Sequence, residues 1–95
     1  MEYLVDMTIS VPDPAGGLLE DEARRAAELT RVGRLLRLWA LPQSGAARRT
    51  LGLWQAPSEA ELMTTLRSLP LYPYMTLTLT PLYRHVNDPQ NGTEA

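Results

Sequence analysis

Two carboxylates in this chain stand where a proton-transfer site could form. Glu22 lies in a segment whose apolar residues recur at helical spacing, which places its side chain on the same buried stripe as Leu29. An apolar pocket raises the pKa of a carboxyl group toward neutrality, as a general base beside a carbonyl group needs. Asp6 lies mid-way along an alternating segment, on the face opposite Val5, and is a second candidate acid or base. The alternatives are a solvent-facing acid in the first helical turn for Glu22 and an ion pair with an arginine of another subunit for Asp6.

A histidine and four aromatic residues complete the set of candidate site residues. His85 is the only histidine, so it cannot join others in a metal cluster, but it could act as an acid or base near neutral pH. The alternative for His85 is a strand-end residue at a subunit contact. Trp39 and Trp54 could form an apolar wall over a flat ring, with Tyr72 and Tyr74 at the mouth of the pocket. Because the chain has no phenylalanine, these aromatic residues are also needed to fill the core or an interface.

The composition excludes several other kinds of chemistry. The chain has 95 residues and a formal net charge of −2, and all nine basic residues are arginine, so no lysine can form a Schiff base. There is no cysteine for a thiolate nucleophile, a disulfide or a metal site. Phosphate-binding, dinucleotide-binding and zinc motifs do not occur, and the charge does not indicate nucleic-acid binding. We therefore expect a small-molecule substrate, no cofactor and no metal.

The chain also lacks the patterns that direct a protein to a membrane. No apolar stretch approaches the roughly 20 residues that span a bilayer. The first residues do not combine a basic segment with an apolar run, as a signal peptide would. We expect a cytoplasmic protein with no membrane partner.

Periodicity and turn residues predict six elements that must position these side chains. Gly33 is a plausible end for the first helix, and Ser58 with Glu61 forms a capping box at the start of the second. The predicted elements are a strand over 2–11, a helix over 19–32, strands over 35–41 and 49–56, a helix from 58 to before Pro70, and a strand over 75–80. This β-α-β-β-α-β order predicts an α+β, ferredoxin-like domain with a four-stranded antiparallel sheet and two helices on one face.

The second face of such a sheet has no cover within the chain. Asp6 and the threonines of the last strand make it partly polar, while Leu4 and either Trp39 or Trp54 add apolar surface. A symmetry mate is the expected cover, so we predict a homo-oligomer, a dimer or a ring of dimers. We place the domain at residues 1–86 and a polar C-terminal tail at 87–95, which could embrace a partner.

One stretch of sequence resembles a known family. The specific part is Leu-Pro-Leu-Tyr-Pro-Tyr-Met at 69–75, which follows the capped helix, and the resemblance extends over about residues 1–88. Weaker matches are Met7-Thr8, Asp21-Glu22, Gly33, Leu38-Trp39 and Arg84-His85. Together these segments resemble the muconolactone delta-isomerase family.

The resemblance implies a fold, an assembly and a reaction. It implies the ferredoxin-like fold and large ring-shaped oligomers, which are decamers in the known cases. It implies migration of a double bond in a lactone by abstraction and return of a proton, without a cofactor. Glu22 aligns with the acid of the family. A sister activity eliminates chloride from a chlorinated muconolactone.

The chain departs from the family pattern at three places where the family has polar residues. The family has lysine at the position of Asp6, arginine at the position of Ala40, and Tyr-Ala-Asn at 48–50, where this chain has Arg48, Arg49 and Thr50. Those groups would bind or polarise a carboxylated lactone, which makes Thr50 a candidate substrate contact. Arg48 and Arg49 could restore anion binding from a shifted position.

We therefore predict a cofactor-free isomerase or cyclase that acts by proton transfer on a small unsaturated lactone, or on a related cyclic or polyketide-like carbonyl compound. We expect a substrate other than muconolactone, in a specialised, secondary metabolic pathway. Two alternatives stay open: an elimination enzyme of the dehalogenase kind on the same scaffold, and a non-catalytic ligand-binding or assembly module.

Overall fold

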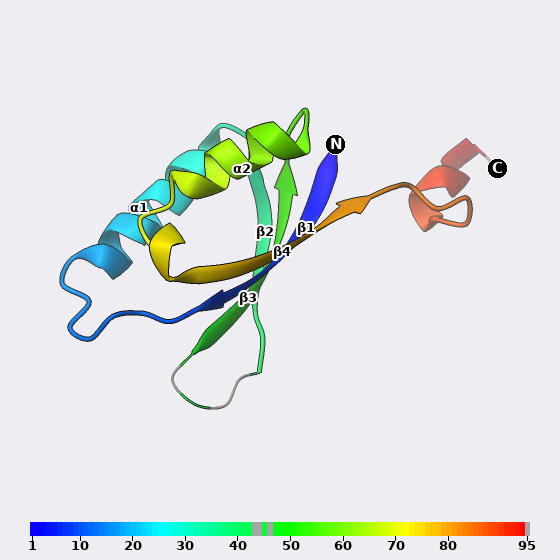
Figure 1. The fold of residues 1–95 in the computed structure, drawn as a ribbon. Helices are drawn as coiled ribbons and strands as arrows, with labels where there is room; N and C mark the ends of the chain where they lie inside the picture. Colours follow the sequence, from blue (N-terminus) through cyan, green and yellow to red (C-terminus); the bar gives the residue numbers. More distant parts are fainter. Residues whose placement is uncertain (43–44, 46, 95) are drawn as a thin grey trace.

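The fold is known from a computed structural model, which describes residues 1–42, 45 and 47–94. Its strands are β1 (Glu2–Ile9), β2 (Leu35–Ala40), β3 (Arg48–Gln55) and β4 (Met75–Leu82); its α-helices are α1 (Leu18–Arg31) and α2 (Glu59–Arg67); two 3-10 helices cover Tyr72–Tyr74 and Pro89–Glu94. The four strands form one antiparallel sheet in the order β2-β3-β1-β4. Both α-helices lie on one face of this sheet (Figure 1). The predicted α+β, ferredoxin-like arrangement is therefore confirmed.

The helix boundaries follow from local chemistry. Helix α1 ends where Gly33 adopts a left-handed φ of 81°, which glycine takes without the steric cost that a side chain would add. Helix α2 begins after Ser58, whose side-chain oxygen accepts a hydrogen bond from the Glu61 backbone N–H at 3.2 Å. This bond is the serine half of the predicted capping box.

Each strand divides its side chains between an inner face under the helices and an outer face without cover in the described chain. In β1, Tyr3, Val5, Met7 and Ile9 are buried, and the residues between them are half-buried. The inner side chains pack against buried leucines of both helices, among them Leu29, Leu62 and Leu66. The core of the domain is thus a single layer between the helices and the inner face of the sheet.

The C-terminal part of the chain leaves this body. After β4 it extends away from the helices and the sheet, in the orange and red part of Figure 1. Tyr83 and Val86 keep 80% and 83% of their surface exposed, which is unusual for large apolar side chains. None of the helices in the described ranges is long and apolar enough to cross a membrane.

Candidate active site

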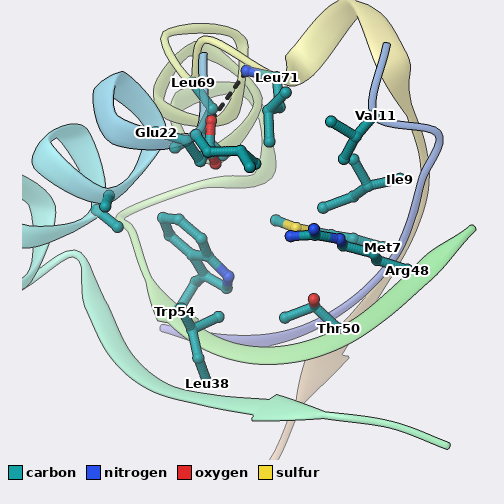
Figure 2. Close-up of a pocket in the computed structure, with 13 residues that line it drawn as sticks. Met7, Ile9, Val11, Glu22, Leu38, Arg48, Thr50, Trp54, Leu69 and Leu71 are labelled. Carbon is teal, nitrogen blue, oxygen red and sulfur yellow. Dashed lines mark hydrogen bonds between the residues drawn. The ribbon is translucent and has the colours of Figure 1, made fainter. Parts of the chain in front are cut away.

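A cavity of about 340 Å³ lies between α1, the segment after α2 and the inner face of the sheet. This volume is near the lower end of the range for small-molecule sites, so it suits a compact ligand. Most of its lining is apolar, and Figure 2 shows the side chains that surround it. The lining residues are Met7, Ile9, Val11, Leu19, Glu22, Ala23, Ala26, Leu38, Arg48, Thr50, Trp54, Leu69 and Leu71.

Glu22 is the one carboxylate in this lining. It lies in the first half of α1, on the stripe that faces the sheet, as its helical spacing predicts. Its Oε1 accepts a hydrogen bond of 2.9 Å from the backbone N–H of Leu71, drawn as a dashed line in Figure 2. Burial raises the pKa of Glu22 above its ordinary value, and the Leu71 hydrogen bond lowers it by a smaller amount. The net shift is in the direction that a general base requires.

The floor of the cavity is the inner row of β3, which carries Arg48, Thr50, Gly52 and Trp54. Alternate residues on one face of a strand are roughly 7 Å apart, so this row spaces its polar groups along the whole cavity. Arg48 is exposed, and among the described residues no carboxylate pairs with it. β1, the neighbouring strand, carries only apolar side chains and Tyr3 on this face, so the polar character of the floor comes from β3.

Trp54 is a special case within this row. Its side chain is 1% exposed, and its Nε1 donates no hydrogen bond to any residue in the described part of the chain. A buried donor without a partner costs about 1–3 kcal/mol, so most folded domains contain few of them. The indole also lies over Gly52, because a Cβ at that position would stand 2.5 Å from Nε1.

Asp6 and Trp39 lie outside the cavity, on the outer face of the sheet. Asp6 forms an ion pair with Arg49, with 2.9 Å between its Oδ2 and the Arg49 Nη2. The guanidinium of Arg37 lies over the ring of Trp39, 5.0 Å from the ring centroid, in a cation–π contact. Within one chain, Asp6 therefore does not converge on the cavity with Glu22, and its catalytic role stays a prediction.

His85 and the two predicted tyrosines also lie apart from the cavity lining. His85 follows the end of β4 and is exposed, and its Nδ1 accepts a hydrogen bond from the Asn87 backbone N–H at 2.9 Å. Tyr72 is half-buried against the core, and Tyr74 keeps 40% of its surface exposed. Of the eight predicted site residues, the structure brings together Glu22, Thr50 and Trp54.

Arg48 lines the cavity but is not one of the eight predicted site residues; the sequence suggests it only as an anion contact from a shifted position. The signal for it was present in the two-residue period of β3, because Arg48 shares a face with Thr50 and Trp54 while Arg49 does not. The described ranges contain no cluster of three or more residues that could hold a metal ion.

Comparison with known proteins assigns the chain to a family. The family model for muconolactone delta-isomerase matches residues 1–88. The chain belongs to the muconolactone delta-isomerase family. It is 36% identical to the muconolactone delta-isomerase of Pseudomonas aeruginosa, over 90% of this chain and 91% of that protein. It is 32% identical to the enzyme of Acinetobacter baylyi, over 85% of this chain and 82% of that protein.

A solved structure supports the same assignment. The crystal structure of a muconolactone isomerase superposes with a TM-score of 0.77 and 32% sequence identity, and the match covers 94% of this chain and 95% of that one. The resemblance that the 69–75 motif indicated is therefore confirmed over nearly the whole domain.

Proposed function

We propose that this protein is a cofactor-independent isomerase that moves a double bond in a small unsaturated lactone, or in a related cyclic carbonyl compound, with Glu22 as the acid–base group. One observation carries the proposal: a half-buried carboxyl with a raised pKa faces an otherwise apolar cavity of ligand size. A general base works best when its pKa lies near the working pH, and burial brings Glu22 in that direction.

The reaction needs one group that takes and returns a proton. The Glu22 carboxylate removes a proton from the carbon beside the carbonyl group, and the electron pair of that C–H bond moves into the ring as an enolate. The carboxylic acid so formed exchanges its proton with solvent and delivers a proton to a carbon farther along the conjugated system, where the new C–H bond forms. The carboxylate is regenerated, so no oxidant, reductant or second substrate is consumed.

The polar groups of the floor support a substrate other than muconolactone. Arg48 and Thr50 line the cavity at positions where the family pattern has tyrosine and asparagine. An exposed guanidinium at the rim suits a carboxylate or another anionic group on the substrate. A change in the groups that contact the substrate changes which compound is bound, while Glu22 keeps the proton chemistry.

Proton exchange in heavy water tests this function without knowledge of the natural substrate. Purified protein is incubated with muconolactone and with a panel of unsaturated lactones and cyclic enones, and NMR follows deuterium uptake and double-bond migration. We expect catalysed uptake for at least one member of the panel and slower turnover of muconolactone. Release of halide from a chlorinated lactone, without migration, would assign an elimination enzyme instead. Binding of panel members without uptake or elimination would point to a ligand-binding module.

We also propose that a second copy of the chain covers the outer face of the sheet. Leu4, Leu51 and Leu53 lie together on that face, and Trp39 keeps 36% of its surface exposed there. An antiparallel sheet commonly leaves one face exposed to solvent. A central apolar strip such as Leu4, Leu51 and Leu53, with charged residues around it, is typical of a subunit contact. On this proposal the mass in solution is at least twice the 10.6 kDa of one chain, as light scattering can measure.

A further inference from the structure

We propose that Trp54 binds an oxygen atom of the ligand by donating a hydrogen bond through its indole N–H. It would then be a binding residue for a carbonyl, enolate or carboxylate group, and not only part of the apolar wall. The inference rests on the proposed function in one respect, namely that the cavity binds a carbonyl compound.

The inference rests on the burial of the Trp54 indole and on the lack of an acceptor for its N–H. The side chain is almost completely buried, and its Nε1 has no acceptor among the described residues. In Figure 2 the indole nitrogen is turned toward the side of the cavity where Arg48 and Thr50 lie. The atom itself has almost no accessible surface, so a ligand oxygen reaches it only when the side chains around it move slightly. A buried donor interacts more strongly with a ligand oxygen than a donor exposed to water does. The missing partner is therefore best supplied by the bound molecule.

Gly52 shows that the strand is built around this position of the indole. An added Cβ would lie 2.5 Å from Nε1 and 3.1 Å from Leu38 Cδ2. Real side chains do not come so close, so any other residue at 52 would displace the indole nitrogen. The backbone at 52 is not in the left-handed region that favours glycine, so close approach is the reason for glycine here.

The neighbours of Trp54 define the chemistry of the ligand. Glu22 faces the cavity from α1, whereas the indole N–H and the Thr50 hydroxyl face it from the sheet. A ligand between these layers can present a C–H bond to Glu22 while its oxygen accepts from Trp54. Charge that develops on this oxygen as the proton leaves would strengthen that hydrogen bond, as in other oxyanion sites. The ligand class is thus a compact cyclic compound whose carbonyl oxygen becomes enolate-like.

The chain offers a direct test because it contains only two tryptophans. The ¹⁵N-labelled protein gives two indole N–H resonances, and Trp39→Phe identifies that of Trp54. The probe is tetronic acid, a five-membered lactone that is ionised as its enolate at neutral pH, titrated to millimolar concentration. We expect the Trp54 indole proton to move downfield together with the Leu71 amide, while the Trp39 resonance stays in place.

Two variants measure the same contact by affinity. Trp54→Phe keeps an aromatic ring and removes the donor, and it should bind the probe on the order of tenfold more weakly, as for the loss of one hydrogen bond to a charged oxygen. Gly52→Ala should weaken binding in the same way while it keeps the indole. Trp39→Phe is the matched control and should bind as the wild type does.

Several results would overturn the inference. These are a shift of the Leu71 amide without the Trp54 indole, no response of the cavity to millimolar probe, or wild-type affinity in Trp54→Phe. If Trp54→Phe does not fold, the wild-type titration and Gly52→Ala decide the question. A normal titration in a protein that catalyses no deuterium uptake would refute the proposed function and leave this inference intact.

Discussion

The outer face of the sheet and the cavity on its inner side contain similar kinds of polar residue, but these residues differ in the partners that they have. The outer face holds an indole, a carboxylate and two guanidinium groups, and each finds a partner within the chain. Asp6 pairs with Arg49, and Arg37 lies over the ring of Trp39. These contacts leave no group in need of a ligand, so this face has the properties of a structural surface.

The cavity between this sheet's inner face and α1 contains corresponding groups, and none of them forms an ion pair among the described residues. Glu22 accepts one backbone hydrogen bond, and its pKa is raised by burial; the Trp54 indole has no acceptor and Arg48 no carboxylate among the described residues. The difference teaches that residue type alone does not mark a site in this fold. Burial with too few partners marks Glu22 and Trp54, because an unsatisfied polar group is a cost that ligand binding can remove. Arg48 is exposed and is marked only by its place in the cavity lining.

The largest expected difference between the cavity and the outer face is in how substitutions there affect turnover. Glu22→Gln keeps the acceptor for the Leu71 amide and removes the base, so the rate on a substrate found in the exchange assay should fall roughly 10²–10⁴-fold. Asp6→Asn makes the same chemical change on the outer face and should keep most of the activity. Steady-state kinetics of the two variants give the comparison.

The opposite result would assign the catalytic role to Asp6 instead of Glu22. If Asp6→Asn abolishes turnover while Glu22→Gln retains it, the outer face of one subunit must complete a site on another. His85→Asn completes the series, because His85 lies apart from the cavity and should also be dispensable.

Most of the fold could be predicted from the sequence because its signals are local. Alternation in β1, the Ser58 cap and the Gly33 stop each depend on a few neighbouring residues, and each agrees with the structure. The element boundaries shifted by one or two residues, as hydrogen bonding at strand and helix ends would be expected to allow. Helical spacing was likewise sufficient to place Glu22 on the buried side of α1.

The site could be predicted only in part because it depends on which strand faces are brought together. Trp39 and Trp54 look equivalent in sequence, but a register irregularity between Leu35 and Arg37 in β2 places Trp39 opposite Leu51, on the outer face. Asp6 was known to face away from Val5, yet its pairing with Arg49 depends on the register of β1 against β3. Such pairings are set by long-range contacts, which single-residue patterns do not encode.

A second variant pair should separate the faces by their effect on assembly. Leu53→Glu adds a charge to the centre of the outer apolar strip, close to Arg37, and should lower the mass measured by light scattering. Ala27→Glu adds the same charge on the exposed side of α1 and should leave the mass unchanged. A wild-type protein that is already a stable folded monomer at micromolar concentration would contradict the proposed subunit contact.

The smallest expected effect is on the pH dependence of stability, and it depends on the raised pKa of Glu22. The folded protein holds a proton on this carboxyl at pH values where the unfolded chain has released it, so stability falls as pH rises from the ordinary glutamate pKa through the raised one. Glu22→Gln has no such group but still accepts the Leu71 hydrogen bond. The Tm of the variant, relative to the wild type, should therefore increase as pH rises above the ordinary glutamate pKa. Glu20→Gln changes an exposed acid of the same turn and is the control for loss of a charge near the start of the helix. A Tm difference that changes in the opposite sense would mean that the Leu71 amide outweighs burial, and Glu22 would then be a weaker base than its place in the cavity suggests.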